Sequence, residues 1–163
     1  MNLKELTKHA VQAALEAGEL IRSYQDREVE VLHKEGGDTY ASQVVTEVDR
    51  KAQDAILQIL GPSCEEFDLA VLTEESEDDG SRFEKECFWC IDPMDGTLPF
   101  IRKEPGYSVS IALVAKDGSP QIGVVCDPVY DVLWQATKGQ GVRRNGEPWA
   151  LDASSQELTF TYD

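Results

Sequence analysis

The residues best suited to chemistry lie in two short acidic segments. The first is Glu74-Glu75-Ser76, and the second is Asp92-Pro93-Met94-Asp95-Gly96-Thr97. Mg²⁺ prefers oxygen ligands in an octahedral array and takes few carboxylates, which leaves positions for water and for a phosphate group. Asp92 and Asp95 meet this requirement, because Pro93 fixes its own φ and restricts Asp92 to extended geometry. The pattern predicts a magnesium site beside a phosphate.

Further oxygen atoms and a hydroxyl group lie close to this predicted site. The turn at Pro93 can direct the Met94 carbonyl at the ion, and Glu74 would complete the protein ligands. Gly96 and Thr97 offer free backbone N–H groups and a hydroxyl where a short helix could begin, which suits a phosphate oxyanion. A metal-bound water hydrogen-bonded to Thr97 and to a carboxylate would be the nucleophile. These residues favour a phosphatase.

Each acidic segment also has an ordinary structural interpretation. Asp, Pro and Gly dominate plain turns, so the segment around Asp92 fits a turn equally well when taken alone. Glu74 and Glu75 alone fit surface charge beside an acidic loop. Thr46-Glu47-Val48-Asp49 resembles a capping box, which favours Asp49 as a structural cap rather than a catalytic carboxylate. The residues by themselves leave these alternatives open.

Other catalytic and cofactor motifs are weaker. The cysteines, at positions 64, 87, 90 and 126, are too sparse for a disulfide framework and fit a reducing compartment. Cys87 and Cys90 have zinc-motif spacing, but no second pair follows, which favours structural thiols. His9 and His33 neighbour no Ser or Cys nucleophile, which disfavours a triad hydrolase. Gly139-Gln140-Gly141 lacks the third glycine of a dinucleotide fingerprint.

Composition restricts the partners. The 163 residues suit one domain, and the net charge of −16, from 31 acidic and 15 basic residues, would repel nucleic acid and anionic membranes. A small phosphorylated metabolite could still bind with divalent cations that neutralise the carboxylates. The N-terminus lacks the apolar core of a signal peptide, and no later run reaches the length of a membrane span. We expect a cytoplasmic protein.

The elements that position these residues follow from hydrophobic periodicity. Apolar or small residues recur at helical spacing from Leu3 to about Tyr24, and a second helix is predicted from the capping box to Gly61-Pro62. The runs Leu69-Ala70-Val71-Leu72 and Phe88-Trp89-Cys90-Ile91 have strand length, and each leads into one of the acidic segments. Both acidic segments are therefore predicted at strand ends.

The second half of the sequence predicts an antiparallel meander. Strand-like runs joined by hairpin connections cover Tyr107–Ala115, Gln121–Cys126 and Val132–Ala136, and the glycines of 138–146 suggest one more short hairpin. Two helices followed by such strands predict an α+β fold, with two helices packed on a mostly antiparallel sheet.

In this order, the motifs resemble the N-terminal part of the inositol monophosphatase superfamily. The resemblance covers Val44-Val45-Thr46-Glu47-Val48-Asp49, both acidic segments, and the strands from Gly123-Val124-Val125 to Lys138-Gly139-Gln140-Gly141. Members of this superfamily are Mg²⁺-dependent, lithium-sensitive phosphatases that include inositol monophosphatases, 3'(2'),5'-bisphosphate nucleotidases and fructose-1,6-bisphosphatases. The resemblance implies two or three Mg²⁺ ions, with Mn²⁺ as a substitute.

The resemblance also implies roles for individual residues. The metal ligands would be Glu74, Asp92, Asp95 and the Met94 carbonyl; the substrate would contact Asp95, Gly96 and Thr97; and the catalytic residues would be Glu74, Thr97 and Asp49. We expect a Mg²⁺-dependent phosphomonoesterase acting on inositol monophosphate or a 3'(2'),5'-bisphosphate nucleotide. The alternative is a non-catalytic metal-binding or interaction domain, or an inactive truncated fragment.

Part of the superfamily pattern is missing from this sequence. Residues 1–163 are interpreted as the N-terminal α+β metal- and phosphate-binding domain, without the C-terminal domain that supplies another metal-binding aspartate and most substrate-selecting residues. Trp149-Ala150-Leu151-Asp152 has the wrong spacing to replace that aspartate. A domain built to pack on a second one would leave an apolar face or an open sheet edge. A homodimer that covers it is a further hypothesis.

Overall fold

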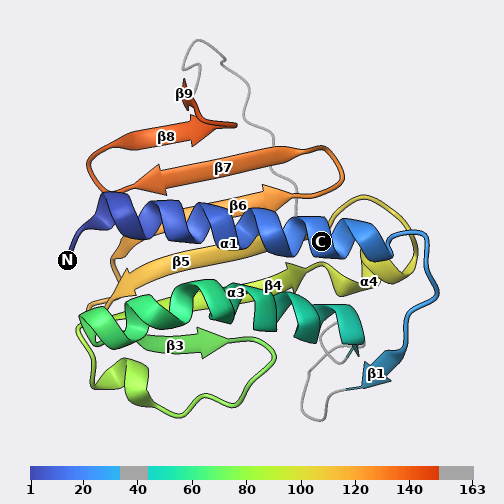
Figure 1. Cartoon of the computed structure of the whole chain (residues 1–163), viewed down its shortest axis with the longest axis horizontal. Helices are drawn as coiled ribbons and strands as arrows, with labels where there is room; N and C mark the ends of the chain where they lie inside the picture. Colours follow the sequence, from blue (N-terminus) through green and yellow to red (C-terminus); the bar gives the residue numbers. More distant parts are fainter. Residues whose placement is uncertain (34–43, 151–163) are drawn as a thin grey trace, which may run out of the picture.

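Two long helices lie side by side on one face of a seven-stranded sheet (Figure 1). The computed structural model describes residues 1–33 and 44–150. The helices are α1 (Leu3–Tyr24), α3 (Glu47–Phe67) and α4 (Thr97–Ile101), with a 3₁₀ turn, η1 (Ser81–Phe83). The sheet contains β3 (Ala70–Thr73), β4 (Cys87–Asp95), β5 (Ser108–Ala115), β6 (Pro120–Asp127), β7 (Val132–Thr137), β8 (Gly141–Arg144) and β9 (Glu147–Trp149). β1 (Val31–His33) and β2 (Val44–Thr46) form a separate antiparallel pair.

The first helix has the bounds predicted from its periodicity. Asn2 is its N-cap, and the Asn2 side chain accepts a hydrogen bond from the Glu5 N–H. Small residues on the buried stripe let α1 approach the sheet closely. At Gly18, an added Cβ would lie 3.0 Å from Cys126 Sγ on β6. The stripe comprises Leu6, Thr7, Ala10, Ala13, Ala14, Ala17, Gly18 and Ile21.

The predicted capping box opens α3. The Thr46 hydroxyl accepts a hydrogen bond from the Val48 N–H at 3.1 Å, and the Asp49 carboxylate accepts one from the Thr46 N–H at 2.7 Å. This pair satisfies backbone donors that a helix start otherwise leaves unpaired. The prediction of the helix start is confirmed.

The predicted end of α3 at Gly61-Pro62 is wrong, because the helix continues through Pro62 to Phe67. Ser63, one residue further on, is buried, and its hydroxyl donates to the Leu60 carbonyl at 2.6 Å and accepts from Trp89 Nε1 at 3.0 Å. This contact with β4 holds the last turns of α3 on the sheet despite the missing N–H of proline.

The strand order of the main sheet is β3-β4-β5-β6-β7-β8-β9. β3 pairs with β4 in parallel, and every other neighbouring pair is antiparallel, which confirms the predicted meander and the mostly antiparallel sheet. β4 runs on to Asp95, four residues beyond the predicted apolar run, and its pairing with β5 shifts register between Asp92 and Asp95. A bulge at this point accommodates the proline, which cannot donate to the ladder.

The two faces of the sheet differ in burial: one packs beneath α1 and α3, and the opposite face carries exposed apolar side chains. Alternate residues of β4, β5 and β6 are buried beneath α1 and α3, including Trp89, Ile111 and Val124. On the opposite face Val125 is 38% exposed, and Trp134 of β7 packs edge-to-face on Trp149 of β9 with ring centroids 4.9 Å apart. A homodimer that covers this face stays a prediction. None of the helices in the described ranges is both long and apolar enough to cross a membrane.

Candidate active site

The parallel pairing of β3 and β4 brings the two acidic segments together. Thr73 pairs with Ile91, and the Glu74 N–H donates to the Ile91 carbonyl at 3.2 Å. Because parallel strands end at the same edge of a sheet, Glu74 after β3 lies beside Asp92 near the end of β4. The sequence placed both segments at strand ends, and this structure adds that the strands are neighbours.

Three carboxylates interact at this edge. The pKa of Asp92 is raised to about 8, first by burial, then by the negative charge of Glu74 and a side-chain hydrogen bond with Glu74, and further by the charge of Asp95. The Met94 N–H, which donates to Asp92 Oδ1 at 3.1 Å, lowers this pKa and offsets part of the rise. Burial and the neighbouring acidic side chains therefore oppose the ionisation of Asp92 in the absence of a cation.

The chemistry of these donors fits a hard divalent cation. Carboxylate oxygens are the ligands that Mg²⁺ prefers, and such a cation would neutralise the repulsion among Glu74, Asp92 and Asp95. Within residues 1–33 and 44–150, no three acidic, histidine or cysteine side chains are already arranged to hold an ion. Glu74 and Asp92 interact directly, whereas Asp95 is exposed at the end of β4. The Glu74–Asp92 pair is thus the centre of the candidate metal site.

A second group of side chains connects α3, β4 and α4. The buried Thr97 hydroxyl donates to Asp49 Oδ1 at 2.9 Å and also lies 3.3 Å from the Met94 carbonyl oxygen. Asp49 Oδ2 accepts from the Thr46 N–H at 2.7 Å and from the Thr46 hydroxyl at 2.6 Å. Asp49 is therefore held in one orientation, with Oδ1 directed at α4.

Burial raises the pKa of Asp49, a residue that is 1% exposed. Hydrogen bonds from Thr46 and Thr97 favour the ionised carboxylate and offset part of that rise. Because burial outweighs these hydrogen bonds, Asp49 accepts a proton more readily than an exposed aspartate does. The capping role that the sequence indicated is present, and it accounts for one carboxylate oxygen while the other contacts Thr97.

Gly96 begins the turn into α4, the short helix predicted at this position. Its φ is 93°, and an added Cβ would lie 2.3 Å from the Gly106 carbonyl oxygen and 3.0 Å from Tyr107 Cα. Glycine is required here by backbone conformation and by the close approach of the chain before β5. The Cβ position of Gly96 thus faces that chain segment.

The predicted site residues therefore form two groups. One contains the carboxylates Glu74, Asp92 and Asp95, and the other joins Asp49 and Thr97, with the Met94 carbonyl beside Thr97. Sequence reasoning gave Thr46 a capping role, which includes the bond from its N–H to Asp49, and missed the second bond, from the Thr46 hydroxyl to Asp49. It also missed Gly106, because nothing in the local sequence reveals a backbone contact with Gly96.

Cys87 and Cys90, whose spacing resembles a metal motif, lie on β4 as half-buried free thiols. Burial is the main cause that raises the pKa of each thiol, and nearby acidic side chains raise it further. Since the thiolate is the metal-binding and nucleophilic form, both positions favour the structural interpretation.

Comparisons with known proteins agree with this geometry. Residues 2–161 match the inositol monophosphatase family. Nus factor SuhB from Escherichia coli (strain K12) is 37% identical over 139 residues, which cover 84% of this chain and 49% of SuhB. Inositol-1-monophosphatase from Synechocystis sp. is 36% identical over 160 residues, which cover 94% of this chain and 53% of that protein.

A solved structure shares the fold. The IMPase from Thermotoga maritima matches with a TM-score of 0.76 at 28% identity, over 92% of this chain and 55% of that chain. This chain spans about half the length of the curated relatives it matches.

Proposed function

Because the chain belongs to the inositol monophosphatase family, we propose that it forms part of a Mg²⁺-dependent phosphomonoesterase. The substrate class is a small phosphorylated metabolite, either inositol monophosphate or a 3'(2'),5'-bisphosphate nucleotide. The observation that carries this proposal is the buried Thr97–Asp49 hydrogen bond beside the Glu74–Asp92 pair. Similarity to the Synechocystis inositol-1-monophosphatase supports it.

The proposed metal site uses the carboxylates at the ends of β3 and β4. Two or three Mg²⁺ ions, or Mn²⁺ in their place, would be held by Glu74, Asp92, Asp95 and the Met94 carbonyl. Bound there, they would neutralise the phosphate and lower the pKa of a coordinated water. The phosphate would lie beside Asp95, Gly96 and Thr97. The oxygen-only donor set and the mutual repulsion of its carboxylates support this assignment.

Thr97 and Asp49 would orient the attacking water and accept its proton. The single hydroxyl hydrogen of Thr97 is donated to Asp49, so the Thr97 oxygen can accept a hydrogen bond from the water. As the water oxygen bonds to phosphorus, its proton passes to Thr97 Oγ1, and the Thr97 proton passes to Asp49 Oδ1. The raised pKa of Asp49 suits it to this task.

The remaining steps complete the hydrolysis. The bond between phosphorus and the ester oxygen breaks, and the leaving alkoxide takes a proton from water to give the free alcohol. The hydroxide left by that water takes the proton from Asp49, which restores the carboxylate. The exposed Glu74 is the second candidate for the catalytic base, besides Asp49. Replacing Asp49 and Glu74 by their amides separately would distinguish these two bases in the pH dependence of kcat/KM.

We further propose that residues 1–163 are the N-terminal metal- and phosphate-binding domain of a longer enzyme. The length of the curated relatives supports this, since the matched region covers 49% of SuhB and 53% of the Synechocystis protein. The other half would supply a further metal-binding aspartate and most substrate-selecting residues. The isolated chain would then bind metal weakly.

The test combines catalysis with metal-linked stability. The chain is assayed with Mg²⁺ on inositol 1-phosphate and adenosine 3',5'-bisphosphate, with and without Li⁺, and its melting temperature is measured with and without Mg²⁺. Asp92→Asn should abolish hydrolysis and the Mg²⁺-linked stabilisation. Asp117→Asn is the matched control, because Asp117 is an exposed carboxylate in the β5–β6 turn.

Two outcomes would argue against the proposal. Hydrolysis that persists in chelator would contradict the metal-dependent mechanism. Stabilisation by Mg²⁺ without hydrolysis, in a chain extended by the proposed second domain, would favour the non-catalytic alternative.

A further inference from the structure

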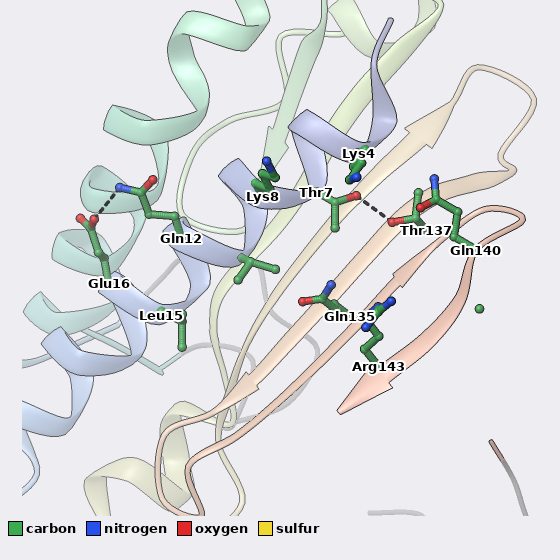
Figure 2. A pocket seen from close by; sticks show the side chains of 12 residues that line it. Lys4, Thr7, Lys8, Gln12, Leu15, Glu16, Gln135, Thr137, Gln140 and Arg143 are labelled. Carbon is green, nitrogen blue, oxygen red and sulfur yellow. Dashed lines mark hydrogen bonds between the residues drawn. The ribbon is translucent and has the colours of Figure 1, made fainter. Parts of the chain in front are cut away.

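A cavity of about 570 Å³ lies between the N-terminal half of α1 and the strands β7 and β8 (Figure 2). These strands lie on the far side of β5 and β6 from β3 and β4, which carry the candidate active site. None of the residues that line the cavity belongs to that site. The volume is in the range of small-molecule binding sites.

Cations line two opposite walls of this cavity. Lys4 and Lys8 project from one face of α1, as residues four apart on a helix do, and Arg143 projects from β8 across from them (Figure 2). No carboxylate of the described residues forms an ion pair with these three side chains. In a chain with a net charge of −16, this is a local concentration of positive charge that would attract anions.

Neutral polar and apolar groups occupy the space between the cations. Val11 and Leu15 continue the α1 stripe of Lys4 and Lys8, and Leu15 is 45% exposed. The pairing register of β7 and β8 places Gln135 beside Arg143 and leaves Thr137 opposite a glycine, Gly141. The carboxylate on the wall, Glu16, accepts a hydrogen bond from Gln12 at 3.0 Å.

Hydrogen bonds fix both walls of the cavity. The buried Thr7 hydroxyl donates to the Leu3 carbonyl at 2.8 Å, so the Thr137 hydroxyl, 2.8 Å from Thr7 Oγ1, is the donor in their contact. This bond connects α1 directly to β7. Arg143 Nη1 donates to the Gly146 carbonyl at 2.9 Å, which restrains the guanidinium. A cavity with restrained walls loses little entropy when a ligand binds.

From these features, we propose that the cavity is a second ligand site, for a small metabolite with two anionic groups separated by a short apolar part. One phosphate or carboxylate group binds between Lys4 and Lys8. The other binds Arg143, whose planar guanidinium suits such oxyanions. The apolar part contacts Val11 and Leu15. This site is independent of the proposed hydrolysis and needs no metal.

The test uses 1,5-naphthalenedisulfonate, a non-hydrolysable molecule with two anionic groups on an apolar ring. It is titrated into the ¹⁵N-labelled chain in chelator, and amide chemical shifts are followed by NMR. Shift changes should concentrate at residues 4–16 and 135–143 and leave 92–97 unaffected. Inorganic sulfate, which lacks the ring, and 1,5-dihydroxynaphthalene, which lacks the charges, should each bind at least about tenfold more weakly.

Paired variants identify the residues responsible. Arg143→Gln and Lys8→Gln should each weaken the disulfonate about tenfold. The matched controls are Arg144→Gln, whose guanidinium lies over the Trp134 ring, and Lys138→Gln in the β7–β8 turn, outside the lining. Both controls should leave the affinity unchanged. Equal weakening by Arg144→Gln, shifts confined to 92–97, or no saturable binding would overturn the proposal.

Discussion

The Thr97 hydroxyl donates a 2.9 Å hydrogen bond to Asp49 Oδ1 across 48 residues of sequence. It joins the first turn of α4 to the first turn of α3, next to the carboxylates at the ends of β3 and β4. The same bond has a structural and a proposed catalytic consequence. It fixes the position of α4, and it leaves the Thr97 oxygen available as an acceptor.

Thr97→Val should destabilise the chain by about 1–3 kcal/mol, because the buried Asp49 carboxylate loses one of its donors. Thr97→Ser, which keeps the hydroxyl, is the matched control and should change stability by less. Urea unfolding of the three proteins measures the difference. Equal stability of the valine and serine variants would show that the bond contributes little.

Asp92→Asn should stabilise the metal-free chain at pH 7, because burial and the charges of Glu74 and Asp95 raise the pKa of Asp92 to about 8. The folded chain must then keep a proton that the unfolded chain releases, and asparagine does not carry this cost. Asparagine keeps an Oδ1 acceptor for the Met94 N–H. A gain of about 1 kcal/mol raises the melting temperature by roughly 2–4 °C in a chain of this size. Thermal unfolding in chelator measures this, and a lower melting temperature would contradict the described repulsion.

Gly96→Ala should destabilise the chain by about 3 kcal/mol or more, since its Cβ would meet the Gly106 carbonyl and Tyr107. Gly139→Ala is a matched control, with a φ of 77° and no atom within 4 Å of the added Cβ. It carries the left-handed backbone penalty of about 1–2 kcal/mol without the clash. Chemical denaturation of both variants gives the difference, and equal losses would contradict the close approach to Gly106.

The Cys126 thiol should resist alkylation at pH 8 in the folded chain. Burial beneath α1 raises its pKa from 9.0 to about 11, so little thiolate forms. Mass spectrometry after iodoacetamide treatment should find Cys126 modified last among the cysteines. Modification of Cys126 before the half-buried Cys87 would contradict its burial.

The same shift predicts how stability changes with pH. Between pH 9 and about 11 the unfolded chain loses the Cys126 proton while the folded chain keeps it, so this contribution to stability, complete below pH 9, is lost as pH rises. Cys126→Ala lacks the titrating group and should show a shallower decline in urea midpoint over this interval. Parallel declines in the two proteins would contradict the raised pKa.

Local patterns predicted most elements, because they depend on residues close in sequence. The α1 bounds followed from its apolar stripe, and the α3 start followed from the capping residues Thr46 and Asp49. The end of α3 was not predictable in this way. The helix continues past Pro62 where Ser63 packs on Trp89, and these two residues are 26 apart in the sequence.

The candidate site was predictable in its residues but less so in its arrangement. The acidic segments were visible as motifs, yet their proximity depends on the parallel pairing of β3 with β4. The need for glycine at Gly96 depends on Gly106, which follows α4 in the chain. No sequence motif indicates the cavity beside α1, because its lining residues, within 4–16 and 135–143, are far apart in the sequence.

The candidate active site and the cavity beside α1 require different lengths of chain before their hydrogen bonds can form. The Asp49–Thr97 bond needs α3, β4 and α4, whereas the Thr7–Thr137 bond joins residues 130 apart and needs β7. Because a chain is synthesised from its N-terminus, the Asp49–Thr97 bond can form before β7 is available to contact α1. Ribosome-stalled chains ending after β6 and after β8, probed by limited proteolysis, would show α1 protected along its N-terminal half only in the longer chain.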